Sequence, residues 1–198
     1  MLNVLPVVLA VIAVLQGATQ QLGHPPRWPA HAVIAVWVDS PGAPSGAEAL
    51  VDRALATWTR AADGDVVLQK AASRDSALIR VRFAQADGIY GEAAPRVDRS
   101  TGTITSAEVL IIGDVPGDPL QQGIVIYLTA LHELGHALGL PHTAVFDDIM
   151  YSFRRPDDGE RYFGAYRRRL RSTRDIGSER ATGVSAGDLA SLRTLYRR

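Results

Sequence analysis

Three histidines at fixed spacing constrain the fold of this chain more than any other feature. His132, His136 and His142 fit the pattern H-E-x-x-H-x-x-G-x-x-H, with Glu133 and Gly139 at the other specified positions. On an α-helix, His132 and His136 lie one turn apart on the same face, so their imidazoles can bind one cation. Gly139 can adopt φ > 0, which lets the chain leave the helix and bring His142 back as a third ligand. The pattern predicts a helix and a sharp turn around a metal ion.

The number of ligands indicates the kind of metal site. Three protein ligands leave one coordination position for water, which is typical of catalytic zinc. Glu133 directly follows the first ligand and can reach that water, so it is the candidate general base. The alternative is an amphipathic core helix whose histidines only pack. Because three of the five histidines fall within residues 132–142 at ligand spacing, we favour the metal site.

The first part of the chain, residues 1–20, holds a short apolar run that ends in Gly17 and Ala18. This composition is typical of a secretory signal peptide and predicts a secreted protein, periplasmic or extracellular. No Lys or Arg precedes the run, and an uncleaved anchor is the alternative. Membrane contact is expected only through this segment, if it is uncleaved. Residues 21–29 form a polar, proline-rich linker, and residues 30–198 are expected to form one domain.

Composition excludes several other roles. The net charge is zero, which argues against nucleic acid or a membrane surface as the main partner. The chain has no cysteine, so neither disulfides nor thiolate ligands are available. We expect a monomer.

Hydrophobic periodicity predicts an α+β fold. Strands are expected at residues 31–38, 66–70, 77–84 and 102–112, and helices at 47–61 and 121–138. Residues 90–95 are expected to form a loop. The order is β-α-β-β-β-α, which predicts a mixed sheet with the metal helix packed below it.

Two further segments resemble a known family. Ile149-Met150-Tyr151 is similar to the metzincin Met-turn, and residues 188–196 are similar to the C-terminal helix of matrixins. Ser185 and Asp188 form a capping signature at the start of that helix. With the long histidine pattern, the sequence resembles the metzincin metallopeptidases of the matrixin type. The resemblance implies a zincin-like fold with a mixed twisted sheet, a backing helix, an active-site helix and a C-terminal helix. It also implies that Met150 lies beneath the metal without binding it.

The chain departs from the matrixin pattern in four ways. Thr143 stands where the family usually has Ser after the third histidine, and no cysteine is present for the usual latency device. Gly187 stands where the family often has a second Asp. No histidine between His31 and His132 could help to hold a second, structural zinc. Asp114 and Asp118 offer oxygen ligands for calcium as a second ion, although aspartate is common in surface turns that bind no ion.

The resemblance implies a secreted zinc-dependent endopeptidase that hydrolyses peptide bonds through a zinc-bound water activated by Glu133. A protein or peptide substrate should lie extended along an edge strand, for which residues 105–112 are the candidate. Leu128 and Tyr151 are candidate substrate-binding residues, although Leu128 suits core packing equally well. The alternative function is a catalytically silent metal-binding interaction protein with a metzincin fold.

The segment 153–183 is rich in arginine and is the least similar to the family. A solvated loop or helix is the default interpretation. The alternative is a basic surface near the site that favours acidic substrates.

Overall fold

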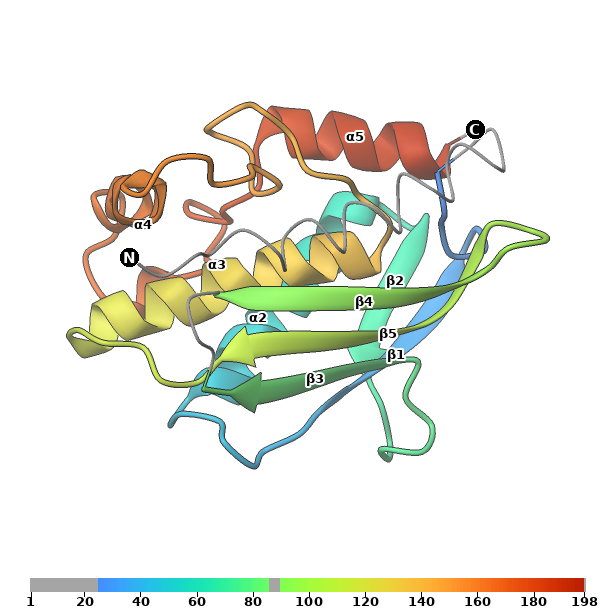
Figure 1. Ribbon diagram of the computed structural model, residues 1–198, viewed down its shortest axis with the longest axis horizontal. Helices are drawn as coiled ribbons and strands as arrows, with labels where there is room; N and C mark the ends of the chain where they lie inside the picture. The colour runs from blue at the N-terminus through green and yellow to red at the C-terminus, as the bar shows by residue number, and fades with distance from the viewer. Residues whose placement is uncertain (1–24, 86–89, 198) are drawn as a thin grey trace.

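A computed structural model describes residues 25–85 and 90–197, and it contains a five-stranded mixed sheet (Figure 1). The strand order is β2-β1-β3-β5-β4. Three neighbouring pairs are parallel and only β4 runs antiparallel, against β5. The strands are β1 (Ala32–Val38), β2 (Val66–Lys70), β3 (Ile79–Ala84), β4 (Gly91–Asp98) and β5 (Thr103–Ile112). This arrangement confirms the predicted α+β class with a mixed sheet.

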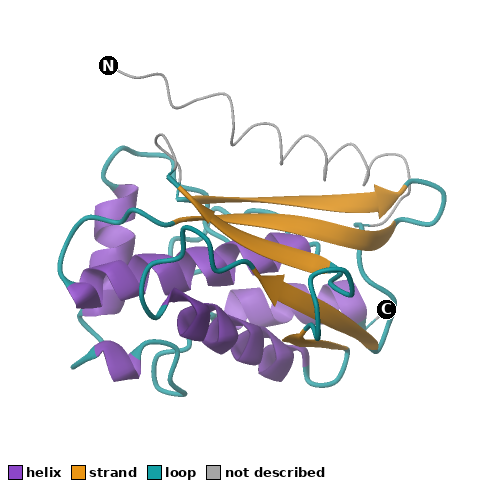
Figure 2. Cartoon of the chain, turned by 90° about the horizontal axis from the view of Figure 1, so that it is seen from below, coloured by secondary structure: helices purple, strands orange, loops and turns teal. Residues whose placement is uncertain are grey.

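The described helices lie together on one side of the sheet, as Figure 2 shows. Helices α2 and α3 pack against each other, and α3 also contacts β4 and β5. Buried apolar side chains from the sheet and from these two helices form one core. The helices are α2 (Ala47–Ala62), α3 (Pro119–Ala137), α4 (Asp158–Arg167) and α5 (Ala186–Tyr196), with a short 3-10 helix at Thr173–Asp175. None of the helices in the described ranges is long and apolar enough to cross a membrane.

Strand β4 corrects two expectations. Residues 90–95 were expected to form a loop, but β4 begins at Gly91 and pairs along its whole length with β5. Gly91 and Pro95 suggested a loop because both residues are rare within strands. Proline is tolerated here because β4 is the edge strand. The prediction that residues 105–112 form the edge was therefore wrong, since β5 lies between β3 and β4.

The described part of the expected linker packs against the domain. Trp28 is buried, and its indole N–H donates to the carbonyl of Ala137 at 2.8 Å. Arg27 forms a bridge with Thr103 at the start of β5. The expected signal peptide at residues 1–20 lies outside the described residues, and its assignment stays a prediction.

The arginine-rich segment contains helix α4 and a capped 3-10 turn. Phe163 and Tyr166 are the buried aromatic residues of α4 and attach it to the domain. Arg167 pairs with Asp118 at the start of α3, at 2.8 Å. Part of the predicted basic surface is therefore used within the fold.

Candidate metal centre

Helix α3 carries two of the three candidate ligands. It begins after Asp118, whose carboxylate accepts from the backbone N–H of Gln121 at 2.8 Å and caps the helix. Nearly every side chain from residue 123 to its end is buried, as expected for a helix inside the core. The carbonyls at its C-terminal end have no intrahelical partner. The indole N–H of Trp28 donates to the carbonyl of Ala137, and the Tyr196 hydroxyl donates to the carbonyl of Leu138 at 2.7 Å.

The turn after α3 brings the third histidine back to the helix. Gly139 has φ +100°, in the left-handed region that favours glycine, as the sequence predicted. The N–H of Leu140 donates back to the carbonyl of Gly135 at 3.0 Å and closes the turn. His142 then lies beside the helix, opposite His132 and His136.

The three imidazoles converge on one point. Nε2 of His142 lies 3.2 Å from Nε2 of His132 and 3.1 Å from Nε2 of His136. Tetrahedral zinc with Zn–N bonds of about 2.0–2.1 Å would separate its ligand nitrogens by about 3.3 Å. Among the residues that the structure describes, this is the group of side chains placed to hold a metal ion.

Hydrogen bonds fix which nitrogen faces that point. Nδ1 of His132 contacts the carbonyl of Ile149 at 2.6 Å, and Nδ1 of His136 contacts that of Leu140 at 2.8 Å. A carbonyl can only accept, so each Nδ1 carries the proton and each Nε2 presents a lone pair. This outer support is typical of metal-binding histidines.

Burial keeps the three rings neutral. Burial lowers the pKa of His132. It lowers the pKa of His136 well below the ordinary value, and the neighbouring rings of His132 and His142 lower the pKa of His136 further. Burial and His132 lower the pKa of His142 to about 4. Neutral imidazoles have free lone pairs at neutral pH, so the donor set suits a metal cation.

Glu133 is buried beside the ligands, with 6% of its surface exposed. Burial and the charge of Glu92 raise the pKa of its carboxyl to about 8 in the metal-free protein. A bound cation would lower this pKa again. The first residue of β4 lies against Glu133, because a Cβ atom on Gly91 would be 2.8 Å from its Cγ. The candidate general base therefore lies between the ligands and the edge strand.

Met150 lies under the ligand helix. Its sulfur and methyl group pack against Gly135, between the two helical histidines. Met150 is 1% exposed. Its N–H and that of Ile149 donate to the carboxylate of Asp188 in α5, at 3.3 and 2.8 Å. The C-terminal helix thus holds the turn that carries Met150.

Helix α5 begins with the predicted capping box. Ser185 accepts from the N–H of Asp188 at 3.0 Å, and Asp188 accepts from the N–H of Ser185 at 2.8 Å. Ser185 also donates to Asp148 at 2.6 Å. A Cβ atom on Gly187 would lie 2.6 Å from Oδ1 of Asp148. The space beside position 187 is occupied by Asp148, which is a physical reason for glycine there.

The two candidate substrate-binding residues lie in different surroundings. Leu128 is buried, with Cδ2 against Gly183. Tyr151 is half-buried, and its hydroxyl donates to Asp158 at 2.8 Å. For both residues, contact with a substrate stays a prediction.

Calcium binding also stays a prediction. The carboxylate of Asp118 accepts from Arg167 through both oxygens, at 3.1 and 2.8 Å, while Asp114 is exposed.

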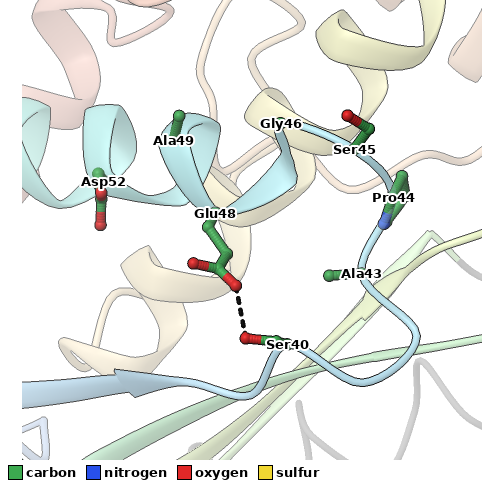
Figure 3. Close-up of a pocket in the computed structure, with 8 residues that line it drawn as sticks. All are labelled: Ser40, Ala43, Pro44, Ser45, Gly46, Glu48, Ala49 and Asp52. Atoms are coloured by element: carbon green, nitrogen blue, oxygen red, sulfur yellow. Dashed lines mark hydrogen bonds between the residues drawn. The ribbon is translucent and has the colours of Figure 1, made fainter.

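A separate hollow at the start of α2 contains none of the histidines (Figure 3). Within it, Ser40 donates to Glu48 at 2.6 Å.

The motif led directly to the histidines and Glu133, but other contributors to the site were missed. Asp188 was recognised as a helix cap and not as the acceptor for Ile149 and Met150. Glu92 was placed in a loop, away from Glu133. No local pattern marks either relationship, because each joins segments far apart in the chain.

Comparisons with known proteins agree with this geometry. Metalloendoproteinase 1 from Glycine max is 27% identical over 139 residues, which are 64% of this chain and 45% of that protein. The chain therefore spans less than half the length of that relative. A family model described as matrixin matches residues 39–162, more than half of the chain. That match includes the three histidines, Glu133 and Met150, and the chain belongs to the matrixin family of metallopeptidases.

Proposed function

We propose that this protein is a zinc-dependent endopeptidase. The observation that carries the proposal is the convergence of three neutral imidazoles beside one buried carboxylate, that of Glu133. A site that only stores a metal needs the histidines but has no need of that carboxylate. Family membership and the plant relative's printed name support the same class.

His132, His136 and His142 would hold the zinc ion through Nε2. Zinc in such a site lowers the pKa of a bound water to about 7 and polarises a carbonyl oxygen. The protein contributes the open coordination position, the orientation of the rings and a buried setting.

Glu133 would move the proton. Its carboxylate accepts a proton from the attacking water and then delivers it to the nitrogen of the leaving amine. The pKa of about 8 without metal marks an environment that favours the protonated carboxyl. A cation in the site favours the carboxylate, so a cation would prepare Glu133 to act as a base.

The substrate would lie along the free edge of β4. The carbonyl of Tyr90 accepts from Ile112 at 2.8 Å, so alternate residues from Tyr90 onward face β5. Gly91, Ala93 and Pro95 then direct their backbone groups to the open edge. An extended peptide can pair with Gly91 and Ala93 as an added strand. Pro95 has no N–H, so this edge lacks a backbone donor at that position.

We also propose that the protein is exported. The apolar run within residues 1–20 supports a signal peptide. The N-terminal sequence of protein recovered from the culture medium or periplasm tests this point. An intact residue 1 in exported protein would indicate an uncleaved anchor.

Cleavage of a denatured protein tests the proposed function. We expect the wild type to cleave it, a chelator to stop the reaction and added zinc to restore it. Glu133→Ala should retain zinc and lose about 10²- to 10⁴-fold in rate, the usual contribution of a general base. Two zinc-loaded proteins that are equally inert would support the catalytically silent alternative. Equal cleavage by both would contradict the role of Glu133.

A further inference from the structure

His142 is supported differently from the other two ligands. Nδ1 of His132 and Nδ1 of His136 each contact a backbone carbonyl. Nδ1 of His142 is buried and has no hydrogen-bond partner within residues 25–85 and 90–197. The orientation of the His142 ring is therefore set by the backbone that carries it, and not by a hydrogen bond from Nδ1.

That backbone is joined to the segment after Met150. Thr143, the next residue, forms an isolated parallel bridge with Tyr151. The N–H of Thr143 donates to the carbonyl of Met150 at 2.8 Å, and the N–H of Ser152 donates to that of Thr143 at 3.2 Å. A displacement of Tyr151 would therefore move the backbone that carries His142.

Tyr151 is in turn fixed by Asp158, the first residue of α4. Oδ2 of Asp158 accepts from the Tyr151 hydroxyl at 2.8 Å and from the N–H groups of Arg154 and Arg155 at 2.8 and 3.0 Å. The Asp158 side chain is 1% exposed. One buried oxygen thus accepts three hydrogen bonds from residues 151–155.

Helix capping alone does not account for this arrangement. A carboxylate in the first turn of a helix can accept from a backbone N–H just before the helix, as Asp188 does from Ser185, and the bonds from Arg154 and Arg155 are of this kind. The third donor to Oδ2, the Tyr151 hydroxyl, is a side chain seven residues before Asp158 and lies outside that pattern. Asp158 therefore organises the segment between the Met150 turn and α4.

We propose that Asp158 is a positioning residue for the metal site. It acts through Tyr151 and Thr143 to set the position of His142, and it touches neither the metal nor the substrate. The proposal rests on the metal-binding part of the proposed function and does not depend on turnover. It also gives the Tyr151 hydroxyl a defined role as the link between Asp158 and His142.

Binding of Co²⁺ in place of zinc tests the proposal without any substrate. Its visible absorption reports the geometry of the ligands, and titration gives the affinity. We expect Asp158→Ala to weaken binding about 10-fold, the lower end of the range for residues that orient ligands. Its absorption bands should also change in position or intensity. Tyr151→Phe, which keeps the ring and removes one hydroxyl, should change both readouts in the same direction by a smaller amount.

Two further variants sharpen the test. Asp158→Asn keeps one carbonyl oxygen that can take the place of Oδ2, so it should recover part of the affinity lost in Asp158→Ala. Asp175→Ala is the matched control, because Asp175 accepts from Arg171 and Ser172 in a comparable turn at the 3-10 helix. Its Co²⁺ affinity and spectrum should equal those of the wild type.

The outcomes separate this proposal from the proposed function. If Tyr151→Phe and Asp158→Asn fold as the wild type does and bind Co²⁺ with unchanged affinity and spectrum, Asp158 is not a positioning residue. An equal change in Asp175→Ala would also overturn the proposal, because the effect would then be general destabilisation. If the wild type binds neither Co²⁺ nor zinc, the proposed function itself fails.

Discussion

The sulfur of Met150 occupies the space in which a side chain at Gly135 would begin. A Cβ atom at position 135 would also lie 3.1 Å from Cζ2 of Trp58. The indole of Trp58 is fixed by its hydrogen bond to the carbonyl of Leu131 at 2.8 Å. The ligand helix, Met150 and Trp58 are therefore packed in close contact directly behind the histidines.

Gly135→Ala should destabilise the protein although alanine is the better helix former. The new Cβ atom would overlap the sulfur of Met150, so overpacking should cost toward the upper end of about 1–3 kcal/mol. This cost exceeds the roughly 1 kcal/mol gained from helix propensity. Urea unfolding of the metal-free protein measures the difference. Gly164→Ala in α4 is the control, since its nearest new contact is Nη1 of Arg168 at 3.7 Å. That variant should gain stability, and a gain in both would contradict the packing argument.

Glu133→Gln should change how the stability of the metal-free protein depends on pH. The pKa of Glu133 is raised from 4.5 to about 8. The folded state therefore binds the proton of Glu133 more tightly than the unfolded state does. The stability that this proton gives is lost as pH rises from 4.5 toward 8. The pKa values of the three histidines are lowered, so the stability that they contribute is instead lost as pH falls below 6.5. Between pH 6.5 and 8, the stability of the wild type should fall by about 1–2 kcal/mol relative to that of Glu133→Gln, which has the same histidines.

Thermal or urea unfolding across that pH range, with a chelator present, provides the measurement. Glu133→Gln should lack the fall that Glu133 causes, because glutamine does not titrate. Glu179→Gln, at an exposed position, should keep the wild-type slope. A wild type that gains stability relative to Glu133→Gln from pH 6.5 to 8 would have the wrong sign for this assignment.

Asp188→Ala should weaken both the fold and the metal site. The substitution removes the acceptor for the N–H groups of Ile149, Met150 and Ser185. Unsatisfied buried donors cost about 1–3 kcal/mol each, so a loss of several kcal/mol is expected in urea unfolding. Asp98→Ala, which removes an acceptor for Ser100 in an exposed turn, should have a much smaller effect. Similar losses in the two variants would argue against a special role for Asp188.

Gly91→Ala should reduce turnover while zinc affinity stays close to that of the wild type. A Cβ atom at position 91 would lie 2.6 Å from Cγ2 of Thr129 and 2.8 Å from Cγ of Glu133. The start of β4 must therefore move away from α3, and an edge-bound substrate would move with it. Misplacement on this scale should lower kcat/KM by about 10- to 100-fold.

Ala94→Val is the control for the edge strand, because Ala94 is exposed on the same strand. Its kcat/KM should remain near the wild-type value. If Gly91→Ala cleaves peptides as fast as the wild type does, the substrate does not depend on the start of β4.

How much the sequence could predict depends on the distance between interacting residues. His132, His136 and His142 lie within one helix and one turn, so their spacing alone was enough to predict that their side chains come together. The bond from Asp188 to Met150 spans 38 residues, and local patterns do not encode such a contact. The Tyr151–Asp158 bond is closer in sequence, but it depends on where α4 begins.

Strand β4 shows a different limit. Its short sequence contains Gly91 and Pro95, which favour loops when intrinsic propensity is considered alone. Pairing with β5 overrides that preference, and its position at the edge makes Pro95 acceptable. Because this strand was missed, the free edge was assigned to β5 instead.

The dependence of the Met150 turn on Asp188 also has a consequence during translation. The ribosome releases the three histidines and Met150 before it releases α5. Until Asp188 has emerged, the N–H groups of Ile149 and Met150 have no acceptor in that helix, and the floor of the metal site is unsupported. A nascent chain of this protein should therefore hold a metal ion poorly until α5 has emerged, so the proposed activity would begin only after synthesis.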